Sequence, residues 1–338
     1  MTILSVAVDD GGRRLDRVLR KALPGIPLSR IHRLLREGRV LVDKRPRDAA
    51  FRVQAGQEIA LPLTPSALGT PGTPDTPRRD DARRSYAAAS PIVSRILYEG
   101  PDLLALNKEA GLPVHGPQAA GSLDSLVRAY LAPKLPPSLS FRPGPLHRLD
   151  KPTSGIVIFS VSLKGARYFS ALLREGRVHK QYLALVEGRV EGPGRWEDPL
   201  LRDREQRRTL VSAGGKPART AYTPLAWSPG SPGHGYSLLL LEPETGRGHQ
   251  IRAQAAFHSH PLAGDSAYGG RPLPPQQPPS KPQPSPQPGA HAGAAYRPPF
   301  LLHAWKLRAA EQGPLPPLEA PLPDYFRIRI ETLFGTRL

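Results

Sequence analysis

A short polar turn ahead of an apolar strand carries the residues best suited to chemistry. The stretch PLHRLDKPTSGIVIFS, residues 145–160, places one carboxylate, Asp150, among His147, Arg148 and Lys151. A carboxylate surrounded by cations and hydrogen-bond donors stays ionised, so it can serve as a nucleophile or a base. A lone aspartate in a loop is as often a turn-former or an ion-pair partner. This stretch alone leaves both interpretations open.

A second segment carries an aromatic side chain beside a cation. HKQYLALVEG, residues 179–188, places Tyr182 two positions after Lys180. Strands favour half-buried aromatic residues, so a structural role is the simpler interpretation. The functional alternative is a ring that stacks on a nucleobase.

A third segment combines a flexible turn with basic residues. In PETGRGHQIRAQAAFHSHPLAGDSAYGG, residues 243–270, Arg247 lies in a glycine-rich turn before a predicted helix. A helix N-terminus readily holds phosphate, and the spacing predicts that His249 and Arg252 share one helix face. The histidines lack the HExxH spacing, and no Walker loop or GxGxxG motif occurs. We therefore expect no metal and no cofactor.

The composition narrows the class of protein. The 338 residues include 47 Lys and Arg against 29 Asp and Glu, a net charge of +18, which favours a polyanionic partner such as nucleic acid. The absence of cysteine excludes disulfide scaffolds, thiolate zinc sites and cysteine nucleophiles. No apolar run reaches the roughly 18–20 residues of a membrane span, and the first residues lack a signal-peptide pattern. We expect a cytoplasmic protein without a membrane partner.

Proline-rich stretches divide the chain. Residues 64–90 have almost no large apolar side chain and are typical of a linker, and residues 271–299 contain 11 prolines, typical of an extended surface insertion. The predicted parts are a small basic domain over 1–63, the linker 64–90, and a large domain over 91–338 that contains the insertion.

The small domain combines helices with a strong positive charge. Apolar spacing predicts a helix over 15–23, a second helix capped by Ser29 and ended near Gly38, and strands over 40–42 and 53–61 joined by a Lys-Arg-Pro turn. Arginines on the polar sides of the helices are either a solvated face or, as we expect from so few compensating acids, a face that contacts phosphates. The candidates are Arg13, Arg17, Arg30 and Arg33.

The large domain mixes helices and strands without a regular βαβ alternation. The pattern predicts a hairpin over 96–108, strands over 156–161, 181–190, 219–225, 236–242 and 300–307, and helices over 122–132, 163–175, 249–257 and 325–334. This order predicts an α+β fold with a mixed, mainly antiparallel sheet flanked by helices.

Two known families resemble these parts. The first domain, from RRLDRVLRK through SRIHRLLREGRVLVDKRP to VQAGQEIALPL, resembles the S4 RNA-binding domain, with departures at Asp43 and Gln57. Over about residues 93–310 and the closing helix, the chain resembles the RluA-type pseudouridine synthases through HRLDKPTSG, KQYLALVEG and TGRGHQIRAQ with HPLAGDSAYGG. Gly248 and Gln254 depart from the second pattern, so we expect altered substrate contacts near them.

The second resemblance implies a reaction and its residues. Uridine in RNA is isomerised to pseudouridine without a cofactor, with Asp150 as the catalytic aspartate acting either as a nucleophile on the ribose or as a base at its 2′ position. Arg252 matches the residue that pairs with this aspartate, and Tyr182 the tyrosine that stacks on the flipped base. Arg148 is expected to occupy the vacated space. The other expected RNA contacts are His147, Lys180, Arg247 and His249.

The substrate and two rival functions remain to be distinguished. The S4 resemblance favours large-subunit ribosomal RNA of the 23S type, with transfer RNA as a second option, and we expect a monomer. One rival is a catalytically inactive RNA-binding or ribosome-assembly protein. The other is a hydrolase of N-glycosidic bonds, which typically needs a second acid as proton donor. We expect no second carboxylate within these motifs.

Overall fold

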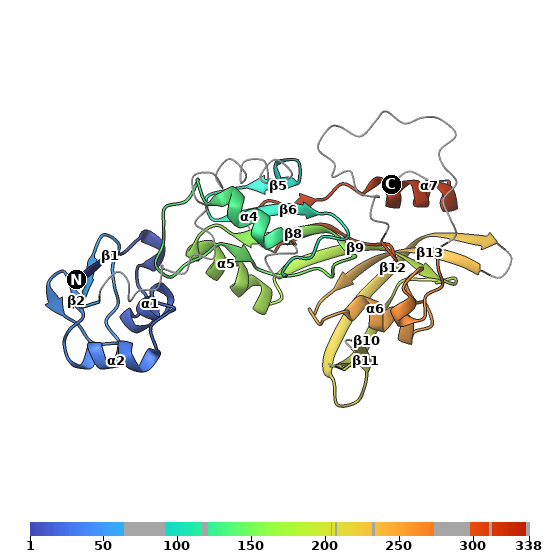
Figure 1. Cartoon of the computed structure of the whole chain (residues 1–338). Coiled ribbons are helices and arrows are strands. Elements are labelled where there is room, and N and C mark those ends of the chain that lie inside the picture. Colours follow the sequence, from blue (N-terminus) through green and yellow to red (C-terminus); the bar gives the residue numbers. More distant parts are fainter. Residues whose placement is uncertain are drawn as a thin grey trace.

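The computed structural model describes residues 1–63, 92–116, 121–203, 205–206, 208–231, 234–273, 298–310 and 313–335. The predicted linker, and the predicted insertion apart from its first and last few residues, lie outside the described residues. The described chain forms an N-terminal lobe, residues 1–63, beside a larger main body, residues 92–335 (Figure 1). Among the described residues, no helix has both the length and the apolar character that a bilayer crossing requires.

The N-terminal lobe packs two helices on a small sheet. The sheet has the strand order β1 (Thr2–Ser5), β4 (Glu58–Leu61), β2 (Leu41–Val42), β3 (Arg45–Pro46), all antiparallel. The helices are α1 (Leu15–Ala22) and α2 (Leu28–Arg36). Their apolar residues, Leu15, Val18 and Leu19 on α1 and Ile31, Leu34 and Leu35 on α2, are buried. The helical spacing thus directs the arginines outward.

Several predicted boundaries in this lobe are wrong. Helix α2 begins at Leu28 after Pro27, whose fixed φ suits a helix start, so Ser29 is not the cap. The turn lies at Asp43 and Lys44, which have φ values of 49° and 65°, and Arg45–Pro46 pairs as a strand instead of turning. Strand β4 covers only the end of the predicted 53–61 strand, and β1 was not predicted.

One buried carboxylate joins the lobe to the main body. Asp10 closes the short helix η1 (Val8–Asp10) and is fully buried. Its oxygens accept hydrogen bonds from the backbone N–H groups of Leu139 (2.9 Å) and Ser140 (2.8 Å) and from the hydroxyls of Ser138 (2.8 Å) and Ser140 (2.5 Å). We call this group, Asp10 with residues 138–140, the Asp10 junction. Because these donors come from the main body, the carboxylate fixes the lobe against it.

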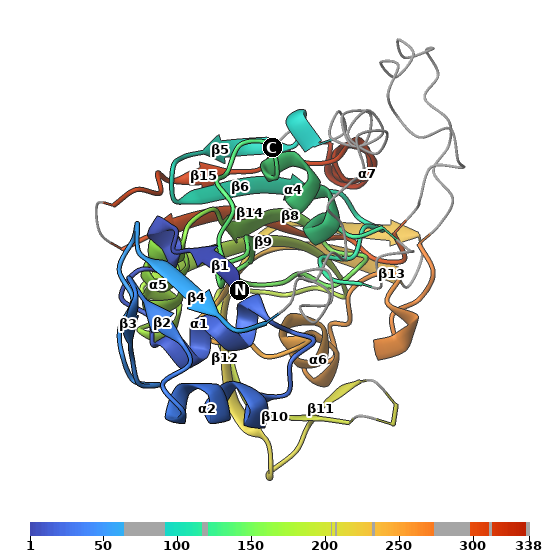
Figure 2. The ribbon, with the colours of Figure 1, turned by 60° about the vertical axis from the view of Figure 1, so that its left-hand side comes forward.

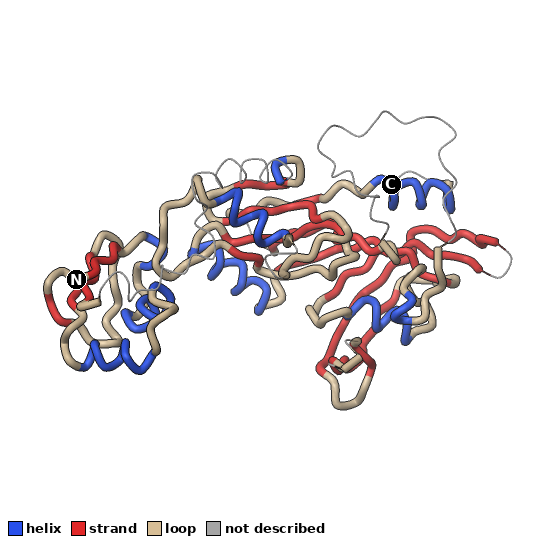
Figure 3. Tube along the Cα trace, in the orientation of Figure 1, coloured by secondary structure: helices blue, strands red, loops and turns tan. Residues whose placement is uncertain are grey.

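The main body is built on one sheet of eleven strands (Figure 3). The path runs β11 (Thr209–Val211), β10 (Gly194–Arg202), β12 (Lys216–Ser231), β13 (His234–Pro243), β9 (Val178–Glu187), β14 (Leu302–Ala309), β8 (Ser154–Ser160), β6 (Leu103–Lys108), β5 (Ile96–Glu99). β15 (Leu318–Glu319) pairs with β14, and β7 (Gly144–Pro145) with β8. Every pairing is antiparallel except β14 with β8. The predicted α+β fold with a mainly antiparallel sheet is confirmed.

Helices cover both faces of this sheet. At one end, α4 (Leu123–Leu131) packs over Leu104 and Leu106 while α5 (Leu163–Arg174) packs over Leu103 and Ala105, so alternate residues of β6 face opposite helices. At the other end, α6 (Gln250–Phe257) and α7 (Asp324–Phe334) cover opposite faces of β9 in the same way. Figure 2 shows α4 and α6 on their separate parts of the body. Helix α4 is capped by Ser122, as predicted.

The parallel pairing of β8 with β14 lies beside the polar turn singled out in the sequence. His303 and Ala304 of β14 pair with Ser154 and Gly155 at the start of β8. Gly155 has a φ of 111°, and a β-carbon there would collide with the Ala304 backbone. Only glycine suits that position, and the close approach fixes the end of the turn that carries Asp150.

Candidate active site

The predicted catalytic residues line one cavity. Asp150 comes from the turn before β8, Tyr182 from β9 and Arg252 from α6, and all three border a cavity of about 290 Å³. The turn that follows β13 closes another side. The cavity is lined by His147, Arg148, Leu149, Asp150, Thr153, Lys180, Tyr182, Pro243, Thr245, Gly246, Arg247, Gly248, His249, Gln250, Ile251, Arg252 and Leu302. Segments more than 100 residues apart in the chain therefore meet at Asp150, the acid of the HRLDKPTSG motif.

Arg252 is shared between two carboxylates. Its Nε and Nη2 donate to the two oxygens of Asp265 at 2.6 and 2.8 Å, and its Nη1 lies 3.5 Å from Asp150 Oδ2. Burial alone would lower the pKa of Arg252, but the two carboxylates outweigh it, so the pKa is raised and the guanidinium stays charged. Asp265 is 2% exposed and Asp150 22%. The inner carboxylate holds the arginine, and the outer one is accessible to a ligand.

His249 lies on the other side of Asp150. Its Nε2 is 3.8 Å from Asp150 Oδ1. The Tyr268 hydroxyl lies 2.8 Å from His249 Nδ1, and the Nη1 groups of Arg202 and Arg252, which can only donate, lie 3.4 Å from the same nitrogen, so Nδ1 is the acceptor. With Nδ1 accepting, the Nε2 of the neutral ring carries the proton and faces Asp150. Burial lowers the pKa of His249, which favours this neutral form although Asp150 opposes the shift.

The remaining wall of the cavity is less polar. Burial raises the pKa of Tyr182, and the nearby Asp150 raises it further, so the phenol keeps its proton. Burial also lowers the pKa of Lys180. His147 accepts a hydrogen bond from the Ile158 N–H through Nε2 (3.1 Å), and burial lowers its pKa to about 3. It is a neutral, backbone-anchored ring at the edge of the cavity.

A buried lysine supports the turn that carries the acid. Lys108 is fully buried at the end of β6, and its Nζ donates to the carbonyls of Glu109, Leu112 and Lys151 at 2.8, 2.9 and 3.2 Å. Burial lowers its pKa to about 7, although the negative charges of Asp150 and then Glu109 oppose this shift. The bond to Lys151 ties this cation directly to the residue after Asp150.

Gln254 has a structural role and does not line the cavity. It is fully buried, and its amide bonds Asp198 Oδ2 (2.8 Å) and the Thr220 hydroxyl (2.7 Å). Gly248 does border the cavity, and its carbonyl accepts from the Thr209 hydroxyl at 2.7 Å. Of the two departures, Gln254 is removed from the cavity and Gly248 is not.

The four candidate arginines of the N-terminal lobe do not line this cavity. Arg17 and Arg30 are exposed on α1 and α2. Arg33 is exposed but bonded to Glu37 at 2.7 Å. Arg13 donates to the carbonyl and hydroxyl of Ser140 at 3.1 and 3.0 Å, beside the Asp10 junction. Arg17 and Arg30 are thus the pair most free to contact a phosphate.

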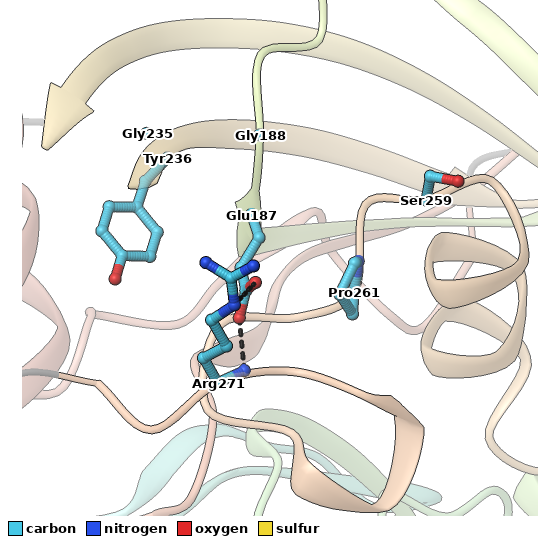
Figure 4. Close-up of a pocket in the computed structure, with 7 residues that line it drawn as sticks. All are labelled: Glu187, Gly188, Gly235, Tyr236, Ser259, Pro261 and Arg271. Carbon is cyan, nitrogen blue, oxygen red and sulfur yellow. Dashed lines mark hydrogen bonds and ion pairs between the residues drawn. The ribbon is translucent and has the colours of Figure 1, made fainter. Parts of the chain in front are cut away.

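A second cavity, of about 210 Å³, offers a weaker case for chemistry (Figure 4). Its one carboxylate, Glu187, accepts from the Arg271 N–H and lies 3.9 Å from the Arg271 guanidinium. The two charges offset each other, and none of the predicted site residues is present. The lining residues are Glu187, Gly188, Gly235, Tyr236, Ser259, Pro261 and Arg271.

Sequence reasoning missed part of the site. Asp265 lies within the quoted HPLAGDSAYGG stretch, so the expectation that these motifs hold no second carboxylate is wrong. Tyr268 lies three residues further on, and Lys108 is in LALNKEAGLPVHG. The sequence did contain a signal for Asp265. A buried arginine needs a carboxylate partner, and Asp265 is an acid that follows Arg252 by 13 positions.

Comparisons with known proteins identify relatives of both parts of the chain. A family model described as RNA pseudouridylate synthase matches residues 102–257, and an S4 domain model matches residues 13–59. The chain is 33% identical over 283 residues to ribosomal large subunit pseudouridine synthase C of Escherichia coli K12, covering 80% of each chain. It is 32% identical over 327 residues to synthase D of Neisseria meningitidis serogroup A, covering 95% of this chain and 79% of that one. In fold it is similar to human RNA pseudouridylate synthase domain containing 4, with a TM-score of 0.55 and 24% identity over 74% of this chain and 97% of that one.

Proposed function

The chain belongs to the RNA pseudouridylate synthase family, and from this premise we propose that it converts uridine to pseudouridine in large-subunit ribosomal RNA, with Asp150 as the catalytic carboxylate. The observation that carries the residue assignment is the position of Asp150: a 22% exposed carboxylate on the cavity wall, 3.5 Å from a buried arginine.

The reaction exchanges one bond for another within a single nucleotide. The N1–C1′ bond of uridine breaks, the uracil turns, a C5–C1′ bond forms, and the proton at C5 is lost while N1 gains one. Asp150 acts on the sugar, either by attack on C1′ or by removal of a 2′ proton. Arg252 orients the carboxylate through its charge, because the two bonds to Asp265 leave Nη1 as the nitrogen nearest to Asp150.

Tyr182 is the surface for the uracil ring. The target uridine has to leave its stack to reach the cavity. Stacking on an aromatic side chain is worth about 1–3 kcal/mol per base. Because its phenol keeps its proton, Tyr182 presents a neutral ring to the base. Arg148 is exposed at the cavity edge, where it can fill the space that the base vacates.

The choice of RNA rests on the relatives and on the first domain. The curated relatives named above are large-subunit enzymes by name, and the S4 model matches the basic N-terminal lobe. The lobe and the main body are joined at the Asp10 junction, so a large folded RNA can contact Arg17 and Arg30 while one nucleotide enters the cavity.

The test is whether removal of the Asp150 carboxylate abolishes one pseudouridine in ribosomal RNA. A strain without the gene is complemented with wild type, Asp150→Asn or Asp203→Asn, and pseudouridines are mapped across its ribosomal RNA. We expect a large-subunit site to be lost in the deletion and with Asp150→Asn, and restored by wild type and by Asp203→Asn, a control on a loop outside the cavity. Restoration by Asp150→Asn would contradict the assignment, and a lost site in transfer RNA alone would contradict the substrate.

The hydrolase alternative is not favoured by the second carboxylate. Both oxygens of Asp265 accept from Arg252, and the side chain is 2% exposed. It is therefore poorly placed to give a proton to a departing base. Free uracil in the reaction mixture would instead support hydrolysis.

A further inference from the structure

The hydroxyl of Thr153 is a buried polar group without a partner. Thr153 is 2% exposed, and among the described residues no group makes a hydrogen bond to its Oγ1. Buried hydroxyls in folded proteins are nearly always hydrogen-bonded, because an unpaired one loses its bond to water without compensation. An orphaned hydroxyl at this position therefore needs an explanation.

The neighbouring hydroxyls are all satisfied. Ser154, the next residue, bonds His303 Nδ1 at 2.8 Å and the Tyr325 hydroxyl at 3.2 Å. Ser160, at the other end of the same strand, donates to the Gly144 carbonyl at 3.1 Å. The surroundings thus supply partners to both hydroxyls of the strand that follows, whereas Thr153 Oγ1 has none among the described residues.

Thr153 also lies on the turn that carries the acid. Its backbone N–H donates to the Asp150 carbonyl at 3.1 Å, which closes the turn between the two residues. Thr153 lines the same cavity as Asp150, Tyr182 and Arg252. Since β-branched side chains have few rotamers, and Gly155 fixes the chain two residues later, the hydroxyl has little freedom to find another partner.

We propose that Thr153 Oγ1 makes a hydrogen bond to the uridine bound in this cavity and positions it against Asp150. This inference rests on the proposed function, since it takes the nucleotide as the occupant. The bound nucleotide supplies the hydrogen-bond partner that Thr153 Oγ1 lacks among the described residues of the free protein, so this hydroxyl is available to bind the substrate. Thr153 is on this view a positioning residue whose contact forms only in the complex.

Two matched variants separate this role from a structural one. Thr153→Val keeps the shape and removes the hydroxyl, whereas Thr153→Ser keeps the hydroxyl. We expect the valine variant to be folded, with a Tm equal to or above wild type, because it removes an unsatisfied buried group. Its single-turnover rate of pseudouridine formation, measured on an RNA fragment that contains the target, is expected to fall about 10- to 100-fold, the range for loss of one hydrogen bond to substrate. The serine variant is expected to stay within about 3-fold of wild type.

Three results would overturn the inference: a valine variant as active as wild type, a serine variant as impaired as the valine one, or a valine variant that loses activity together with a lowered Tm. Asp150→Asn is assayed in parallel on the same RNA. If Asp150→Asn is inactive and Thr153→Val is fully active, the inference on Thr153 fails alone. If Asp150→Asn is fully active, the proposed function of the site fails as well.

Discussion

Arg252 grips Asp265 with two short hydrogen bonds and approaches Asp150 at 3.5 Å with the nitrogen that remains. The inner carboxylate thus determines where the arginine points, and the arginine in turn faces Asp150 on the cavity wall. The aromatic rings of Tyr268 and Phe300 lie 4.8 and 4.6 Å from the guanidinium carbon and confine it further. This arrangement makes Asp265 as important for the site as its exposed counterpart.

Replacing Asp265 with alanine should destabilise the fold and inactivate the site. Removal of one partner from a buried ion pair leaves an uncompensated charge, which costs about 3–5 kcal/mol. We expect a loss of that size in the free energy of unfolding, measured by urea denaturation, and a loss of pseudouridine formation. The control is Asp324→Ala, which breaks an exposed pair with Arg327 and should leave unfolding nearly unchanged. Equal effects of the two variants would contradict the role given to Asp265.

Stability should fall on acidification because two histidines are held in the neutral form in the folded chain. Burial lowers the pKa of His147 to about 3 and of His303 to about 4, from 6.5 in the unfolded chain. Their contribution is fully present above pH 6.5 and is lost as the pH falls toward 4, since the unfolded chain binds protons that the folded chain does not. Between the folded and unfolded pKa values, each histidine makes the free energy of unfolding fall by about 1.4 kcal/mol for each unit by which the pH is lowered.

The slope is measured by urea denaturation between pH 6.5 and 4.5. His147→Gln, whose amide oxygen can accept from the Ile158 N–H in place of the ring, should reduce it by one proton. The exposed His115→Gln serves as the matched histidine replacement and should not reproduce this change. An unchanged slope in His147→Gln would refute the neutral state of that ring.

Tyr182 should act through its ring rather than its hydroxyl in binding. We expect Tyr182→Phe to bind substrate RNA as tightly as wild type and Tyr182→Ala to bind more weakly by about 1–3 kcal/mol. Because burial and then Asp150 raise the pKa of the phenol, wild type and Tyr182→Phe should also share the alkaline limb of any pH–rate profile. Binding by filter retention and rates at several pH values test both points, and a limb that disappears with phenylalanine would show that the phenol titrates.

The Asp10 junction should matter for large RNAs and not for small ones. Both oxygens of Asp10 accept hydrogen bonds. In Asp10→Asn the side-chain NH2 group replaces one of these acceptors and faces an N–H donor, which loosens the contact between the lobe and the main body. We expect a lower kcat/KM on a long folded RNA and an unchanged value on a short RNA that reaches only the cavity. Asp48→Asn, which alters a turn inside the lobe, is the control. Equal losses on both RNAs would contradict a positioning role.

The elements that could be predicted have strong local signals. Ser122 and the apolar residues after it set α4, and the spacing of α5 ends before Gly176, so both helices appear close to their predicted bounds. Strands β10 and β11 could not be predicted in this way. β10 contains Pro199 and mixes charged with apolar residues without a regular alternation, and pairing with β11 and β12 rather than local preference stabilises it.

The main residues of the site could be predicted from the sequence, but the hydrogen bonds and ion pairs that position them could not. The resemblance suggested Asp150, Tyr182 and Arg252, and the cavity brings them together. The bonds that position them depend on the tertiary fold: Arg252 reaches Asp265 past the end of α6, and the Lys108 ammonium reaches a carbonyl 43 positions further along the chain. No local pattern encodes which buried groups become partners.

The buried carboxylate at residue 10 also bears on how a target is chosen. A lobe held in one orientation sets a fixed distance between Arg17 and Arg30, the proposed phosphate contacts, and Asp150, the proposed catalytic acid. On this proposal we expect the three-dimensional shape of the RNA around a uridine, more than the sequence beside it, to decide whether that uridine is modified.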